Sequence, residues 1–185
     1  MRIISGIAGG RRLVAPNGDR TRPTSDKIRG SLFNILMSRI ADSSVLDLFG
    51  GTGAMALEAM SRGAEHAVIV DTDRQAVEAI RKNAQAVLGD DFRAQVDIIK
   101  SDYKRALASL RGKKFDIVIL DPPYAMTDSY AAAQDMLRDS GMLNEDAVIV
   151  CERARDAQAA YAAGYEVYDT RSYGDTVIDL VRLEQ

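Results

Sequence analysis

Residues 44 to 56 read Ser44-Val45-Leu46-Asp47-Leu48-Phe49-Gly50-Gly51-Thr52-Gly53-Ala54-Met55-Ala56, an apolar strand followed by a glycine-rich turn and the start of a helix. A parallel sheet uses this arrangement to bring its backbone close to a nucleotide-like ligand. Glycines are needed there because any Cβ atom would occupy the place of the ligand. We therefore expect Phe49, Gly50, Gly51 and Gly53 to be cofactor-binding residues.

Two acidic residues beside this turn indicate which ligand it holds. Asp71 ends the next predicted strand, 20 residues beyond Gly51, where a carboxylate binds ribose hydroxyl groups. A nicotinamide dinucleotide and S-adenosylmethionine both contain that ribose, and residues 51–56 also fit the G-x-G-x-x-A pattern of dinucleotide enzymes. Asp47 favours S-adenosylmethionine, because a pyrophosphate repels a carboxylate whereas the cationic sulfonium and α-amino group attract one.

From residue 44 onward, short β-rich runs alternate with helical segments. This alternation is typical of an α/β fold whose parallel sheet is covered on both faces, because crossover helices must return the chain. The tight link at residues 172–175 predicts an antiparallel pair of strands at the sheet edge. The expected strands are residues 44–48, 67–71, 96–99, 115–120, 147–151, 165–171 and 176–183, and the expected helices are residues 53–63, 73–88, 103–110, 127–139 and 153–162.

The predicted strand 115–120 ends in Asp121-Pro122-Pro123-Tyr124. Two adjacent prolines fix an extended backbone, so they hold a carboxylate, a carbonyl and an aromatic ring beside the cofactor-binding turn. Hydrogen bonds from an exocyclic amino group to Asp121 and to the Pro122 carbonyl would orient its nitrogen toward an electrophilic methyl group. Tyr124 offers a face on which an unpaired base stacks. The motif predicts N-methylation of a base, and adenine, cytosine and guanine all carry suitable amino groups.

The first 43 residues carry eight basic and three acidic side chains, a net charge of +5, in a chain whose overall net charge is −3. Such a basic head suggests contact with a phosphate backbone, although solvation of an exposed helix face is the alternative. The glycines of residues 2–20 predict a hairpin or extended arm rather than a part of the core. The apolar spacing of residues 25–40 predicts an amphipathic helix with its basic residues turned outward. We expect a basic extension at residues 1–43 that contacts a phosphate backbone, and a methyltransferase domain at residues 44–185.

Composition excludes several other classes of protein. A chain of 185 residues that is 46% apolar matches one soluble domain, and no apolar run approaches the ~20 residues of a membrane span or resembles a secretion signal. Cys151 is the single cysteine, so we expect no internal disulfide, no metal site and a reducing, cytoplasmic location.

Asp102 follows the predicted strand 96–99 and is a candidate contact for the adenine ring of the cofactor, although an Asp in this place is more often a helix cap.

The glycine-rich turn, the Asp121-Pro122-Pro123-Tyr124 motif, the Ser61-Arg62-Gly63-Ala64 segment and the basic head together resemble the bacterial 16S rRNA guanine-N2 methyltransferases. That family has a Rossmann-like class I fold. In the head the likeness lies in Arg2-Ile3-Ile4-Ser5-Gly6, Gly10-Arg11-Arg12-Leu13, Arg22-Pro23-Thr24, Arg29 and Phe33-Asn34. The resemblance implies a seven-stranded, mostly parallel sheet with an antiparallel last strand. It also implies S-adenosyl-L-methionine as the methyl donor and N2 of one guanine in 16S rRNA as the acceptor.

The resemblance further implies roles for individual residues. Cofactor contacts fall on Asp47, Gly51, Asp71 and Asp102, and the catalytic motif falls on residues 121–124, with Asp121 also close to the cofactor. RNA contacts are expected at Arg2, Arg11, Arg12, Arg22, Thr24 and Arg29.

Three positions depart from the pattern of that family. Ile7-Ala8-Gly9 replaces a basic and aromatic stretch, which moves part of the RNA contact to Arg11 and Arg12, while Gly30 and Asp71 each replace a Glu. An adenine-N6 methyltransferase and a non-catalytic RNA-binding module remain alternatives. We expect the protein to be a monomer. We also expect its substrate to be RNA within the small ribosomal subunit or an assembly intermediate, because so small a domain has little surface to specify one nucleotide.

Overall fold

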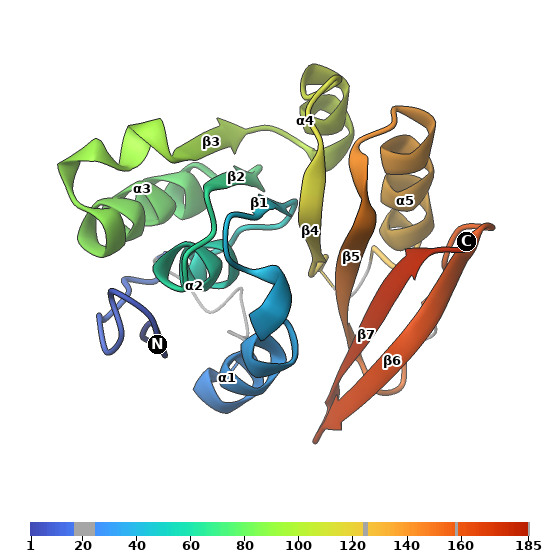
Figure 1. The fold of residues 1–185 in the computed structure, drawn as a ribbon, viewed down its shortest axis with the longest axis horizontal. Coiled ribbons are helices and arrows are strands. Elements are labelled where there is room, and N and C mark those ends of the chain that lie inside the picture. The colour runs from blue at the N-terminus through green and yellow to red at the C-terminus, as the bar shows by residue number, and fades with distance from the viewer. Residues whose placement is uncertain (17–24, 124–125, 158, 185) are drawn as a thin grey trace.

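The computed structural model describes residues 1–16, 25–123, 126–157 and 159–184 and has a seven-stranded sheet at its centre (Figure 1). The strand order is β3-β2-β1-β4-β5-β7-β6, in which the first five strands are parallel and β7 runs antiparallel to both of its neighbours. The predicted α/β sheet with an antiparallel last strand is therefore confirmed. The strands are β1 Ser44–Asp47, β2 His66–Asp71, β3 Val96–Lys100, β4 Phe115–Leu120, β5 Leu143–Ala154, β6 Tyr165–Tyr173 and β7 Thr176–Leu183.

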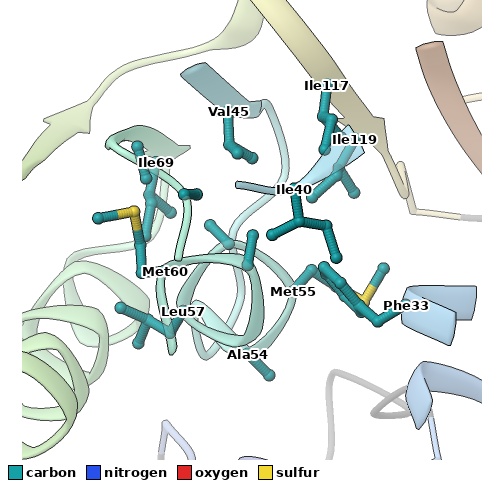
Figure 2. Close-up of a cluster of buried hydrophobic side chains, with 14 of the residues drawn as sticks. Phe33, Ile40, Val45, Ala54, Met55, Leu57, Met60, Ile69, Ile117 and Ile119 are labelled. Atoms are coloured by element: carbon teal, nitrogen blue, oxygen red, sulfur yellow. The ribbon is translucent and has the colours of Figure 1, made fainter. Parts of the chain in front are cut away.

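Helices cover both faces of this sheet, as crossover connections between parallel strands require. On one face, α1, α2 and α3 enclose a core in which Phe33, Met55 and Leu57 pack against Ile69 and Ile119 of the sheet (Figure 2). On the other face, α4 and α5 enclose a second core. The helices are α1 Asp26–Ile35, α2 Ala54–Ser61, α3 Arg74–Leu88, α4 Tyr103–Ser109 and α5 Ser129–Asp139, with short 3-10 turns η1 Met37–Arg39 and η2 Asp90–Ala94.

The N-terminal arm shares the first of these cores. Antiparallel pairing of Arg2 with Arg12 closes a short hairpin-like loop, and Ile3, Ala8 and Leu13 are buried against α1 and α2. The prediction of an arm that does not belong to the core is therefore wrong, because its apolar residues find cover on helices distant in sequence. The head and the sheet form one packed unit, so the proposed boundary at residue 43 remains a prediction about function.

Two predicted helices differ from the structure. The helix expected at residues 25–40 begins at Asp26, after a Ser25 cap, but its α-helical part ends at Ile35 and continues only as the turn η1. The alanine-rich helix expected at residues 153–162 is absent from the described residues of that segment. Instead, β5 continues through Ala154, because Arg153 and Ala154 pair with β7, and this pairing overrides the helical propensity of alanine.

Candidate active site

The glycine-rich turn between β1 and α2 is held by hydrogen bonds from its own backbone. Gly50 N donates to Val70 O at 2.8 Å, and Gly53 N donates to Gly50 O at 2.6 Å. Gly51 N donates to Asp71 Oδ2 at 2.8 Å. The loop is thereby fixed to the carboxyl end of β2 before any ligand arrives.

The three glycines of the turn serve different purposes. A Cβ on Gly50 would lie 2.5 Å from Ile69 Cγ2, so this position is small because of internal packing. Gly53 has a φ of +76°, a conformation that favours glycine, and an added Cβ there would lie 3.3 Å from Ile80 Cγ2. Gly51 has a φ of +55° and no heavy atom within 4 Å of an added Cβ. The expectation that Gly51 leaves room for a ligand is compatible with this open space and remains a prediction, whereas at Gly50 and Gly53 side chains of the protein lie close to the position of a Cβ atom.

Asp71 and Asp102 each have a structural partner. Besides Gly51, Asp71 accepts a hydrogen bond from Asp73 N at 2.8 Å through its other oxygen, so it organises the loop. Each carboxylate oxygen has a second lone pair with which to accept from a ribose hydroxyl. Asp102 is the N-cap of α4, because its side chain accepts from Arg105 N at 3.1 Å. Its proposed contact with adenine remains a prediction, as does the ribose contact of Asp71.

The aromatic ring of Phe49, next to the glycine turn, contacts the ring of Tyr103, the residue that follows Asp102. The ring centroids of Phe49 and Tyr103 are 5.6 Å apart and tilted by 43°. Tyr103, the first residue of α4, is buried in the second core, whereas Phe49 is only partly buried and packs against that core. Phe49 therefore keeps part of its surface available to a ligand beside the glycine turn.

Asp47 is the last residue of β1, and Asp121 directly follows β4, the strand that pairs with β1. Asp47 pairs with Ile119, so Asp121 follows two residues beyond that pair on the same side of β4. Asp47 is only 2% exposed, and burial, aided by the charge of Asp71, raises its pKa from 3.8 to about 7, although it accepts a hydrogen bond from Phe49 N. Burial, Glu152 and Asp47 likewise raise the pKa of Asp121 well above its ordinary value. A cation or a set of hydrogen-bond donors would relieve this concentration of acidic groups.

The two prolines behave differently. Pro122 is buried, whereas Pro123 is exposed and its carbonyl accepts from Met126 N at 2.8 Å, which closes the turn after β4. The chain therefore leaves the sheet edge abruptly after Asp121, as the motif predicts. Tyr124, the fourth residue of the predicted catalytic motif, lies outside the described residues.

The predicted RNA-binding residues divide into three groups. Arg2, Arg11 and Arg12 are exposed on the arm, where Arg2 lies 3.4 Å from Asp26. Arg22 and Thr24 lie outside the described residues.

Arg29 corrects the prediction for the head helix. Its side chain is fully buried, with Nη2 3.0 Å from Asp26 Oδ1 and Nε 3.7 Å from Glu58 Oε2, and it also donates to the Arg2 carbonyl. Arg29 therefore holds the arm and is not available to RNA in this structure. The buried carboxylate of Glu58 and the partly exposed carboxylate of Asp26 pair with this arginine, because an unpaired charge in the core would be unfavourable.

Three polar residues that sequence reasoning missed attach the arm to the helices. Glu58, fully buried in α2, accepts from Ile4 N at 2.7 Å and Ser5 N at 3.1 Å. Ser61 donates to Ser5 O at 2.7 Å, and its hydroxyl accepts from Ala8 N at 3.0 Å. Ser61 opens the Ser61-Arg62-Gly63-Ala64 motif, so that motif has a role in docking the arm.

The third is Asn83 of α3, which joins the arm to the glycine turn. Its side chain accepts from Val14 N at 2.8 Å and donates to Val14 O at 2.9 Å and Thr52 O at 2.8 Å. Nothing in the sequence distinguishes Asn83 from other polar residues of an amphipathic helix.

Glu152 also escaped the sequence analysis, although a signal for it was present. It follows the apolar run of β5, as Asp47, Asp71 and Asp121 follow theirs, and it lies beside Asp121 because Leu120 pairs with Cys151. The predicted strand 147–151 ends immediately before Glu152, so the sequence offers the same signal here as it does for those three carboxylates.

Other kinds of site find less support in the described part of the chain. No group of three or more potential ligands there is arranged to hold a metal ion, and no helix there is long and apolar enough to cross a membrane. A shallow hollow lined in part by Arg39, Tyr168 and Arg182 lies at the amino-terminal edge of the parallel strands. It is at the opposite edge of the sheet from Asp47 and Asp121, so it plays no part in the site described above.

Known proteins resemble this chain over nearly its whole length. The protein described as "Putative rRNA methyltransferase YlbH" of Bacillus subtilis is 34% identical over 98% of both chains. "Ribosomal RNA small subunit methyltransferase D" of Escherichia coli is 35% identical over 82% of this chain and 74% of that protein. The solved structure of "Putative methyltransferase yhhF" from Escherichia coli covers 100% of this chain and 98% of its own, with a TM-score of 0.85 and 30% identity.

More distant structures share the fold, among them a methyltransferase solved with S-adenosylhomocysteine at 16% identity and a TM-score of 0.67. These distant structures show that the chain shares its fold with S-adenosylmethionine-dependent methyltransferases. The family described as "Conserved hypothetical protein 95" matches residues 1–182. With that match and with these relatives, the chain belongs to this family of rRNA methyltransferases.

Proposed function

We propose that this protein transfers a methyl group from S-adenosyl-L-methionine to the exocyclic N2 of one guanine in 16S rRNA. One observation carries the proposal: the glycine turn after β1 and the Asp121-Pro122 elbow after β4 lie side by side at the carboxyl edge of the sheet. Ligands of open α/β sheets bind at this edge, near the point where the strand order reverses. The arrangement therefore brings a nucleotide-like donor and an amino-group acceptor together.

The residues of the glycine turn fit the proposed donor. Gly51 leaves open space at the loop, and Asp71 has spare lone pairs for a ribose. Asp47 is a buried carboxylate whose raised pKa a cationic ligand would lower again. When bound, S-adenosyl-L-methionine supplies an electrophilic methyl group on a positively charged sulfur.

The residues of the elbow position the acceptor. The carboxylate of Asp121 accepts a hydrogen bond from the amino group of the base, and the Pro122 carbonyl accepts from its second N–H, which aims the nitrogen lone pair at the methyl group. A bond forms between this nitrogen and the methyl carbon as the bond from carbon to sulfur breaks. The nitrogen then loses one proton, and Asp121, a carboxylate of raised pKa, is placed to accept it. Tyr124 stacks on the base in this scheme.

The basic arm holds the RNA in this proposal. Arg2, Arg11 and Arg12 are exposed beside the anchored part of the arm. Arg22 and Thr24, which follow them in the sequence, are proposed as further RNA contacts. Arginine side chains on a docked support can bind phosphates without first ordering the chain. The protein acts as a monomer in the cytoplasm, on the small ribosomal subunit or its assembly intermediate.

The test is transfer of labelled methyl from S-adenosyl-L-methionine to rRNA and to partly assembled small subunits, both taken from cells that lack the enzyme. The modified nucleoside is identified after digestion. We expect label in N2-methylguanosine, more of it on the partly assembled subunits. Asp121→Asn serves as the matched control, because it keeps the size of the side chain and is expected to lose at least about a hundredfold in rate.

Each alternative has its own result in this experiment. Label in N6-methyladenosine would show that the protein transfers methyl groups but that its acceptor is adenine and not guanine. No label on either RNA, with RNA binding intact, would favour the non-catalytic RNA-binding module. Equal label on stripped rRNA would remove the requirement for a protein-bound substrate.

A further inference from the structure

Two carboxylates stand next to one another where the target base is expected to enter. Asp121 and Glu152 follow the paired residues Leu120 and Cys151 of the neighbouring strands β4 and β5. Because side chains alternate along a strand, both project on the side of the sheet where Ile119 and Val150 face the first core. Figure 1 shows β4 and β5 side by side, with their carboxyl ends on the same side of the molecule as α1.

The end of β5 is firmly held, so Glu152 has a defined position. Glu152 pairs with Ile178 of β7, and Tyr130 Oη donates to its backbone carbonyl at 2.5 Å. Its side chain is partly buried. The charge of Glu152 contributes, after burial itself, to the raised pKa of Asp121, as expected for carboxylates that directly follow paired residues of neighbouring strands.

The three bases that carry exocyclic amino groups differ in the ring atom beside that group. In guanine, N2 is flanked by the acceptor N3 on one side and by N1–H, a second donor, on the other. In adenine the neighbour of N6 is N1, and in cytosine the neighbour of N4 is N3, and both of these are acceptors. Two adjacent carboxylates can accept two adjacent donors in charge-assisted hydrogen bonds, but one of them would face a lone pair if the base were adenine or cytosine.

We propose that Glu152 is the residue that selects guanine: its carboxylate accepts the N1–H of the target base while Asp121 accepts from the N2 amino group. This inference rests on the proposed function, in that it assumes amino-group methylation at Asp121. It adds a physical reason for the choice of guanine, which the Asp121-Pro122-Pro123-Tyr124 motif alone leaves open. Specificity then comes both from a favourable pair with guanine and from repulsion of the other two bases.

The test compares guanine with 2-aminopurine at the target position that the labelling experiment identifies. 2-Aminopurine keeps the 2-amino group but has an acceptor at N1. We expect the wild-type enzyme to prefer guanine by at least about tenfold to a hundredfold in kcat/KM, the range for a hydrogen bond to a charged group. Small subunits reconstituted with RNA that contains either base serve as the substrates.

Glu152→Gln is the main variant, because its amide can donate to N1 of 2-aminopurine. We expect the preference for guanine to shrink by about tenfold or more, with guanine methylation reduced. Glu152→Ala removes both the acceptor and the repulsion, and should shrink the preference as well. Glu145→Gln, an exposed carboxylate near the start of the same strand, should keep the preference of the wild type.

The readout separates specificity from folding. A variant that merely folds poorly loses activity on both bases to the same extent, so an unchanged preference in Glu152→Gln and Glu152→Ala overturns the assignment. S-adenosylhomocysteine binding reports how much of each variant is folded. If the wild-type enzyme methylates guanine and the variants keep its preference, only the role of Glu152 fails. If the wild type methylates neither base, the proposed function fails.

Discussion

Buried carboxylates lie both where the N-terminal arm contacts α2 and at the carboxyl edge of the sheet, but the first is surrounded by hydrogen-bond donors and positive charges, and the second by other carboxylates. In the contact between arm and α2, Glu58 is surrounded by donors: Arg62 Nε at 2.7 Å, Arg29 Nε at 3.7 Å, and two backbone N–H groups. At the sheet edge, burial and the charge of Asp71 raise the pKa of Asp47, while burial and the charges of Glu152 and Asp47 raise the pKa of Asp121. The first arrangement is complete without a ligand, whereas the second would be stabilised by one.

This difference separates residues that hold the fold from residues available for chemistry. A buried ion pair whose partners are all supplied by the chain resists any change to one member. Carboxylates held together against their repulsion are destabilising until a cation or a set of donors arrives, and such groups are typical of functional sites. Mutations in the two regions should therefore change stability in opposite directions.

Removing the carboxylate at the arm should have the largest effect. Glu58→Ala leaves the fully buried Arg29 without its partner in α2 and leaves the N–H groups of Ile4 and Ser5 without their acceptor. We expect the free energy of unfolding to fall by about 3 to 5 kcal/mol, as for a broken buried pair. Urea denaturation, followed by circular dichroism, measures this change.

Glu78→Ala is the matched control, because Glu78 is exposed on α3 and lies 3.7 Å from Arg74. An exposed pair of this kind contributes at most about 1 kcal/mol, so this variant should unfold almost as the wild type does. Equal losses in the two variants would show that Glu58 does not clamp the arm.

Removing a charge at the sheet edge should have the opposite sign. The pKa of Asp47 is about 7 in the folded protein and close to 3.8 when unfolded, so between these values the folded state binds the proton more tightly. The contribution of Asp47 to stability is therefore present at low pH, decreases as the pH rises from about 4, and is lost above about 7. Asp47→Asn avoids this loss and should be more stable than the wild type by about 2 to 4 kcal/mol at pH ~8, with little difference near pH ~4.

Denaturation of both proteins at the two pH values tests the sign directly, and Asp91→Asn, an exposed residue, is the control. The same substitution should weaken binding of S-adenosyl-L-methionine, since a neutral amide no longer attracts its positive charge. A variant that is less stable than the wild type at pH ~8 would mean that Asp47 is a structural residue like Glu58.

The connection between the two regions should have an intermediate effect. Asn83→Ala removes three hydrogen bonds from a side chain that is 1% exposed and leaves polar groups of Val14 and Thr52 without it. We expect a loss of about 1 to 3 kcal/mol in the free energy of unfolding and faster hydrogen exchange at the Val14 amide. Gln85→Ala on the exposed side of α3 is the control. Unchanged exchange at Val14 would show that Asn83 does not hold the arm.

The sheet edge could be predicted from the sequence to a large extent, because its signals are local. Asp47, Asp71 and Asp121 each follow an apolar run directly, and parallel strands bring their carboxyl ends to one edge. The one member missed, Glu152, is followed by alanines that favour a helix in isolation. Pairing of Arg153 and Ala154 with β7 decides that segment, and this pairing joins residues more than twenty positions apart.

The arm could not be predicted in the same way, because its partners are distant in sequence. Glu58 contacts Ile4, 54 residues away, and Asn83 contacts Val14, 69 residues away. A pattern of exposed arginines looks the same in sequence whether each one faces solvent or, as with Arg29, a buried carboxylate. The glycine turn shows a milder form of this limit, since Gly50 is required by Ile69, a side chain of the neighbouring strand.

The smallest expected effect on stability concerns the exposed arginines of the arm, which we expect to bind RNA without attaching the arm to the core. Arg11→Ala with Arg12→Ala changes side chains that face solvent, so the free energy of unfolding should stay within about 0.5 kcal/mol of the wild type. RNA binding should weaken nonetheless, and the slope of log affinity against log salt should become shallower by about one to two units, close to one for each phosphate that the variant no longer neutralises. The double variant Arg111→Ala with Lys114→Ala, on the body of the domain, should leave that slope unchanged. If the slope moves with the second pair and not with the first, the RNA lies on the body, and the arm serves only to complete the core.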